Sequence, residues 1–153
     1  MKKSIISFVA PGTFEENRFE KLHNIPFESP EAGSIAVAEE ICELIRFKQK
    51  KNEMCVLGLA TGSSPISVYK KLIESHKKKK LSFRNVITFN LDEYFGLEKI
   101  DINSYNQFMH DNLFNHIDIL PKNIHIPKGK LQSSQVINYC KDYEQKILKA
   151  GGD

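Results

Sequence analysis

The sequence predicts an α/β fold, a Rossmann-like parallel sheet with flanking helices, and two observations carry this prediction. Residues 54–59 and 86–89 are continuous apolar runs of strand length, which is typical of strands buried on both faces of a parallel sheet. Segments with helical spacing of apolar residues separate these runs. Strands that alternate with helices indicate right-handed crossovers between parallel strands.

The first elements follow from local signals. Residues 1–21 are polar and turn-rich and are predicted to be an N-terminal extension, which leaves residues 22–153 for the α/β domain. We expect a short strand at residues 25–27. A helix should begin at Ser29-Pro30, because Ser is a favoured N-cap and Pro suits the first turn.

The strand at 54–59 leads into a loop of small residues, Thr61, Gly62, Ser63 and Ser64, and then into Pro65, which we expect in the first turn of the next helix. Such a loop aims unpaired N–H groups and the positive end of a helix dipole at one point, so it predicts an anion site. It lacks the Lys of the nucleotide P-loop and the third Gly of the dinucleotide fingerprint, which disfavours ATP and NAD. The alternative is an ordinary strand-to-helix turn.

The strand at 86–89 is followed by a second polar cluster that contains Asp92 and Glu93. Open α/β sheets bind their ligands at the carboxyl ends of the strands, so the two clusters should share one sheet edge. A helix at 104–114, a strand at 123–126 and a last helix from about residue 133 complete the order. The lysine run at 77–80 closes the helix that begins at Pro65, and a solvated helix end is favoured over a nucleic-acid patch.

Composition restricts the class of protein. The 153 residues suffice for one domain, and the hydrophobic content of 41 % and charged content of 27 % are globular values. A net charge of +3 is too small to imply nucleic acid, and no apolar run approaches the roughly 20 residues that cross a membrane. The N-terminus lacks a typical signal peptide, so we expect a cytoplasmic protein. Cys42, Cys55 and Cys140 are predicted to be buried, reduced thiols, without a disulfide framework or a zinc site.

Three motifs resemble one known family. LGLATGSSP at 57–65, FNLDEYFGL at 89–97 and SYNQFMHDNLFNHIDI at 104–119 are similar to the glucosamine/galactosamine-6-phosphate isomerase family, and to its glucosamine-6-phosphate deaminases in particular. The resemblance runs from about residue 25 to the C-terminus. Ser64 stands where the family usually has Thr. Tyr94 stands where the related 6-phosphogluconolactonases carry Arg, which favours the deaminase branch.

The resemblance implies a reaction and roles for residues. Glucosamine 6-phosphate opens its ring, a base moves a proton from carbon two to carbon one, and ammonia leaves to give fructose 6-phosphate. Asp92 matches the residue that acts as the base in the family. The alternative is a structural role for Asp92 as a turn former or helix cap. The loop from Thr61 to Ser64 would hold the phosphate, and Glu93 would support Asp92. No cofactor or metal is implied, and the complete protein is expected to be a homo-oligomer.

In the family, a further strand and a DGHIAFNEP-like loop follow, and they carry the ring-opening residues. The sequence stops at Asp153, where that strand should begin, so we expect an N-terminal portion of a longer protein or a naturally short member. The chain alone is expected to be inactive. A phosphosugar-binding sensor and a lactonase-type hydrolase remain alternatives. The sequence leaves open the amino sugar, allosteric control and oligomeric state, and it assigns no role to His110, His116 or His125.

Overall fold

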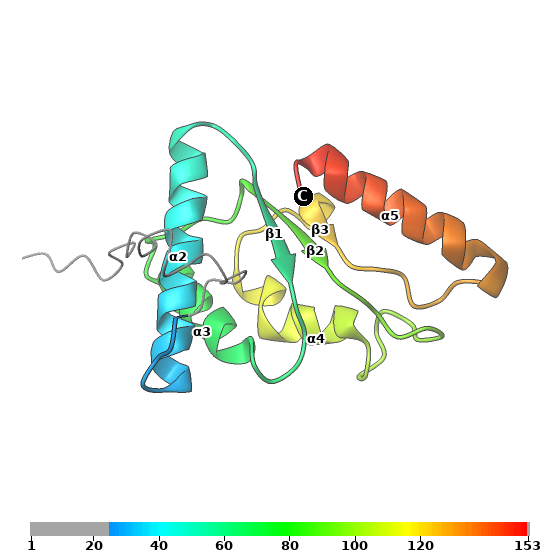
Figure 1. Cartoon of the computed structure of the whole chain (residues 1–153), viewed down its shortest axis with the longest axis horizontal. Coiled ribbons are helices and arrows are strands. Elements are labelled where there is room, and N and C mark those ends of the chain that lie inside the picture. Colours follow the sequence, from blue (N-terminus) through cyan, green and yellow to red (C-terminus); the bar gives the residue numbers. More distant parts are fainter. Residues whose placement is uncertain (1–24, 153) are drawn as a thin grey trace, which may run out of the picture.

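Three parallel strands form the sheet of the computed structural model, which describes residues 25–152. They are β1 (Cys55–Leu59), β2 (Val86–Asn90) and β3 (Ile124–His125), in the order β1-β2-β3. The predicted fold class is confirmed, because helices separate the strands and flank the sheet (Figure 1). The predicted extension at residues 1–21 lies outside the described residues.

Within the described residues, four helices precede, connect or follow the strands, and all four lie close to their predicted positions. They are α2 (Pro30–Lys50), α3 (Ile66–Lys77), α4 (Tyr105–Asn112) and α5 (Val136–Ala150). Short 3-10 turns occur at Phe114–His116, Pro121–Asn123 and Ser133–Gln135. The Ser29 side chain caps α2 by accepting a hydrogen bond from the backbone N–H of Ala32 at 3.1 Å.

The strand predicted at residues 25–27 is wrong. Ile25 to Phe27 are irregular and exposed, and the ring of Phe27 packs instead against Gly33 of α2. Pro26 explains the difference, because it has no N–H to donate to a neighbouring strand. Pro65 also differs from expectation, since it precedes the first residue of α3 rather than lying within its first turn.

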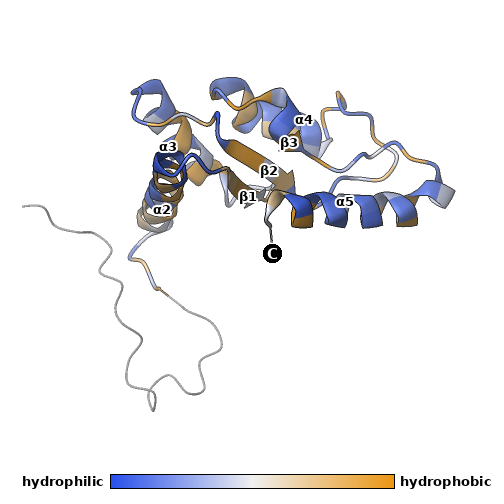
Figure 2. Cartoon of the chain, turned by 90° about the horizontal axis from the view of Figure 1, so that it is seen from above, coloured by the Kyte–Doolittle hydropathy of each residue, from blue (hydrophilic) through white to orange (hydrophobic). Residues whose placement is uncertain are grey.

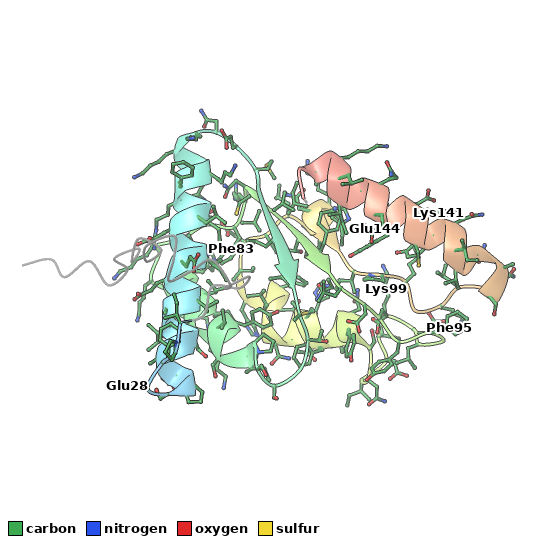
Figure 3. All side chains as sticks on the ribbon, viewed as in Figure 1. Glu28, Phe83, Phe95, Lys99, Lys141 and Glu144 are labelled. Carbon is green, nitrogen blue, oxygen red and sulfur yellow. The ribbon has the colours of Figure 1, made fainter. Side chains whose placement is uncertain are left out.

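One face of the sheet carries the hydrophobic core. Side chains of α2, α3 and α4 pack there against β1 and β2, and Phe83, labelled in Figure 3, is 1 % exposed within this layer. The buried side chains come from every one of these elements: Ala38, Cys42, Ile45, Cys55, Leu59, Tyr69, Leu72, Val86 and Met109. The core is therefore built by the elements that also fix the ends of β1 and β2.

Among residues 25–152, only α5 covers the opposite face, and it lies across the sheet from α4 (Figure 2). Tyr143 of α5 packs edge-on against Phe89 of β2, with ring centroids 5.8 Å apart. Burial of β1 on both faces was predicted and is wrong, because Gly58 is exposed on this side and Met54, just before the strand, is 43 % exposed. The reason is that α5 lies over β2 and β3, so that none of the described helices covers this side of β1.

Two of the three predicted buried thiols are confirmed, since Cys42 and Cys55 are buried. Cys140 is exposed on α5, because that helix contacts the sheet along one stripe only. Burial raises the pKa of the Cys42 and Cys55 thiols. Within residues 25–152 no helix is long and apolar enough to cross a membrane.

Candidate functional site

The loop between β1 and α3 has the geometry of an anion cradle. Gly62 adopts a φ of +102°, a conformation that L side chains rarely adopt. Space around its Cα is open, because a Cβ added there would meet no atom within 4 Å. Ser63 and Ser64 are exposed beside it, and α3 begins two residues after Ser64. The loop therefore faces solvent at the N-terminus of α3, where the Ile66 N–H already donates to the Ser63 carbonyl oxygen at 3.4 Å.

Two buried side chains hold the base of this loop. The Asn90 amide Nδ2 donates to the carbonyl oxygen of Leu59 at 3.2 Å, and the hydroxyl of Tyr69, from α3, donates to the carbonyl oxygen of Ala60. Tyr69 is 2 % exposed, and burial raises the pKa of its hydroxyl to about 12, so it stays a donor at neutral pH. The loop thus grows from a fixed point on the sheet.

Asp92 lies at the same edge, two residues beyond the end of β2. Leu59 pairs with Asn90 in the parallel register, so the polar clusters after β1 and β2 leave the sheet side by side. The carboxyl ends of both strands point toward one edge in Figure 1. The Asp92 side chain is exposed, and among the described residues no hydrogen bond engages its carboxylate. It is free to meet a ligand.

Glu93 has a different environment from its neighbour. Its carboxylate accepts hydrogen bonds from the backbone N–H groups of Tyr94, Tyr105 and Asn106, each at 2.9 Å, and from the Ser104 hydroxyl at 2.7 Å. Burial raises the pKa of the Glu93 carboxyl, but these four hydrogen bonds together outweigh it and leave the pKa below its usual value. Glu93 is thus an ionised clamp on the N-terminus of α4.

Tyr105 and Tyr94 border the site on the side of α4. Their hydroxyl oxygens are 3.2 Å apart, and their rings are tilted with centroids at 4.7 Å. The pKa of Tyr105 is raised by the hydrogen bond with Tyr94, and Thr61 and Asp92 also lie near enough to affect it. The Tyr105 hydroxyl therefore lies near both the loop after β1 and Asp92.

An open groove of about 540 Å³ adjoins these tyrosines, lined by Tyr94, Phe95, Leu97, Asn103 and Tyr105. The segment that forms it, with Phe95 and Lys99 labelled in Figure 3, extends away from the sheet. Gly129 anchors the segment, because its carbonyl accepts from the N–H of Gly96 at 2.9 Å. A Cβ at Gly129 would lie 2.5 Å from the carbonyl oxygen of Tyr94, so only glycine fits.

The three histidines without an assigned role make other contacts. His110 bonds the Asn115 side chain at 3.2 Å and His116 bonds the Asp111 carbonyl at 2.9 Å. His125 instead stacks on Phe89 with centroids 4.5 Å apart, and burial, aided by Lys146, lowers its pKa. Among the described residues, no three His, Cys, Asp or Glu side chains form a group that could hold a metal.

The sequence predicts the loop and Asp92 as site residues, and the structure adds the contacts that Asn90, Tyr105 and Gly129 make beside them. One feature of the sequence could have indicated Tyr105. Ser104 is a strong N-cap, and the first turn of a helix that starts near a sheet edge faces the ligand side. Asn90 was a polar residue inside an otherwise buried strand. That is the pattern of a side chain with a specific partner.

Known proteins share this sequence and fold. The family model for glucosamine-6-phosphate isomerases/6-phosphogluconolactonase matches residues 28–152. A glucosamine-6-phosphate deaminase of Treponema denticola is 52 % identical over 115 residues, which are 74 % of this chain and 42 % of that protein. A deaminase of Thermoanaerobacter pseudethanolicus is 46 % identical over 116 residues, 76 % of this chain and 45 % of that protein.

Solved structures agree with these sequence matches. A monomeric glucosamine-6-phosphate deaminase superposes with a TM-score of 0.76 at 38 % identity, over 84 % of this chain and 51 % of that one. A 6-phosphogluconolactonase of Thermotoga maritima has a TM-score of 0.61 at 24 % identity, over 77 % and 51 %, and thus shares the fold. The chain spans about half the length of these proteins. By the match of its sequence and the agreement of its fold, it belongs to the family of glucosamine-6-phosphate isomerases and 6-phosphogluconolactonases.

Proposed function

We propose that this chain supplies the phosphate-binding loop and the proton-transfer carboxylate of a glucosamine-6-phosphate deaminase. The observation that carries the proposal is the meeting of two polar clusters at one sheet edge, where Leu59 and Asn90 are register partners. A sugar phosphate bound with its phosphate on the loop after β1 would extend its carbon chain toward the residues after β2. The similarity to deaminases at 46–52 % identity supports the same reaction.

The phosphate of a hexosamine 6-phosphate would lie on the backbone of Gly62, Ser63 and Ser64. Positive φ at Gly62 turns the chain so that successive N–H groups can face one anion, and the dipole of α3 favours negative charge at its N-terminus. The hydroxyls of Thr61, Ser63 and Ser64 add neutral donors. Ser64 keeps the hydroxyl that the family's usual Thr would provide.

Asp92 would act as the base. Once the sugar ring is open, the carboxylate takes the proton from carbon two and returns it to carbon one, and the carbon–nitrogen bond is hydrolysed so that water is consumed and ammonia leaves. A positioned proton transfer of this kind contributes typically about 10²- to 10⁴-fold. Exposure and the absence of hydrogen bonds to Asp92 from the described residues suit this role. Glu93 is unsuited to it, because four donors already occupy its carboxylate.

The resemblance to deaminases supports further features of the proposal. The enzyme would be a cytoplasmic hydrolase of amino-sugar metabolism, without cofactor or metal, and a homo-oligomer when complete, with no nucleic acid or membrane as partner. Tyr94 supports a deaminase over a lactonase. The groove lined by Tyr94 and Tyr105 gives room for the sugar beyond Asp92.

A titration tests the phosphate site directly. Glucosamine 6-phosphate added to the ¹⁵N-labelled chain should shift the amide resonances of Gly62, Ser63 and Ser64 in a saturable manner, whereas glucosamine without phosphate should leave them in place. A response of equal size to both sugars, or shifts centred on residues away from the loop, would contradict the proposal.

A further inference from the structure

Asn90 links the two polar clusters of the site. It is the last residue of β2, it is 2 % exposed, and its side chain crosses to the last residue of β1, where Nδ2 donates to the Leu59 carbonyl oxygen at 3.2 Å. The backbone pairing of the strands ends here, so this side chain continues the connection by one more bond. Leu59 lies two residues before Thr61, the first residue of the phosphate loop, and Asn90 lies two residues before Asp92.

Stability alone does not explain an amide at this position. Among residues 25–152, Oδ1 of Asn90 has no hydrogen-bond partner although it is fully buried, and the same is true of Oγ1 of Thr88. A buried, unpaired acceptor is unfavourable, and an apolar side chain of the same size would avoid it. Each such group needs an explanation, and a functional role is one of them.

The backbone of Asn90 is fixed as well. Its carbonyl oxygen lies 2.9 Å from the hydroxyl of Tyr143, which lies 3.0 Å from the carbonyl oxygen of His125. That hydroxyl is half-buried, and burial raises its pKa, so it remains a donor. Asn90 is thus held from α5 on one side of the sheet while its side chain holds the loop on the other.

We propose that Asn90 is a positioning residue that sets the spacing between the phosphate loop and Asp92. The proposal rests on the proposed function, because the spacing matters only to a ligand that contacts both clusters. A phosphate ion contacts the loop alone. An open-chain hexitol 6-phosphate contacts both the loop and the edge that carries Asp92, and its affinity depends on the distance between them.

The test compares the two ligands in the full 153-residue chain. Asn90→Leu keeps the branching and the number of side-chain heavy atoms but removes the donor, and Asn90→Ser is a smaller, polar second variant. Dissociation constants for inorganic phosphate and a hexitol 6-phosphate are measured by NMR titration. We expect the affinity for phosphate to stay within about twofold. The affinity for the hexitol 6-phosphate should fall by about tenfold, the effect expected for the loss of one hydrogen bond.

Asn123 offers a matched control. It is also a buried asparagine, 8 % exposed, and its Nδ2 donates to the Val86 carbonyl oxygen at 3.0 Å, at the opposite end of β2. Asn123→Leu removes an equivalent bond and should leave both affinities unchanged.

Three results would overturn the positioning role while the proposed function stands: unchanged hexitol 6-phosphate binding in Asn90→Leu and Asn90→Ser, an equal loss for both ligands, or the same selective loss in Asn123→Leu. A wild-type chain that binds neither ligand would instead overturn the proposed function, and the role of Asn90 with it.

Discussion

Two neighbouring carboxylates show how strongly single residues differ at this site. Asp92 is exposed at the sheet edge, whereas Glu93 is held by four hydrogen bonds and its pKa lies below the usual value. The acidic pair is therefore one reactive candidate and one structural clamp. Substitution of Asp92 should therefore affect catalysis, whereas substitution of Glu93 should affect stability.

Asp92→Asn should abolish turnover with little effect on folding. In the polypeptide that carries this chain together with the second half of the family fold, we expect kcat to fall by about 10²- to 10⁴-fold, because the base is lost while shape is kept. The melting temperature should hardly change, since the side chain is exposed. Exchange of the carbon-two proton with solvent measures the proton transfer. A wild-type exchange rate in the variant would contradict the assignment of Asp92 as the base.

Gly62→Ala should weaken phosphate binding and cost about 1–2 kcal/mol of stability, because a φ of +102° is strained for any L side chain. Gly58→Ala is the control, since a Cβ at either glycine meets no atom within 4 Å but only Gly62 has positive φ. The control should stabilise the strand by about 0.5–1 kcal/mol. Urea unfolding and phosphate titration report both quantities, and equal behaviour of the two variants would refute the role of Gly62.

At the scale of elements, the N-terminus of α4 depends on one side chain from another segment. Glu93 reaches Ser104, Tyr105 and Asn106, and it thereby fixes the first turn of α4 next to the phosphate loop. A second carboxylate, Asp118, binds the Phe83 N–H at 2.6 Å and the Ser82 hydroxyl at 2.7 Å. Glu93 and Asp118 therefore make similar sets of hydrogen bonds, but only Glu93 lies at the candidate site.

Glu93→Gln should lower the free energy of unfolding by about 1–3 kcal/mol at neutral pH, as expected for hydrogen bonds to a charged group. Because its folded pKa is lowered, Glu93 contributes stability that is fully present above the ordinary value of 4.5 and is lost as pH falls through the folded pKa. The difference between wild type and variant should therefore shrink below about pH 4.5. Urea unfolding across pH measures it.

Asp118→Asn is the control for this clamp. The pKa of Asp118 is also lowered: burial raises it, but bonds from Phe83 and Ser82, with His76 nearby, outweigh burial. We expect a similar acid dependence in both variants, with weaker binding of glucosamine 6-phosphate only in Glu93→Gln. Equal binding in the two variants would show that the clamp stabilises α4 without shaping the site.

For the whole molecule, the uneven covering of the sheet has consequences. Within the described part of the chain, the core closes the face toward α2, α3 and α4, whereas β1 is open on the other face. Large apolar side chains such as Met54, Ile137 and Leu148 are exposed there or on α5. Open apolar surface and an unprotected strand favour association. The chain also spans only about half the length of the relatives that it matches.

We therefore predict that the 153-residue chain alone self-associates and releases no measurable ammonia from glucosamine 6-phosphate. Catalysis needs the full set of groups in one geometry, since residues that act as a unit do not contribute independently. Light scattering and an ammonia-release assay on a chain of verified mass test both parts. Robust ammonia release that disappears in Asp92→Asn would contradict the prediction.

The sequence by itself determined the order of strands and helices, the loop from Thr61 to Ser64 and the position of Asp92. Continuous apolar runs, caps and small-residue loops act over a few residues, so they can be predicted without knowledge of packing. A local pattern can still give a wrong prediction where a single residue prevents the expected structure. Pro26 does this for the strand expected at residues 25–27.

Only the tertiary structure decided which polar groups meet. The partners of Glu93 in α4 are 11 to 13 residues away, Asn90 reaches Leu59 across 31 residues, and Tyr143 reaches Asn90 across 53. Cys140 likewise became exposed because α5 lies over β2 and β3 alone. Such pairings depend on how whole elements pack, and no local pattern of apolar and polar residues encodes them.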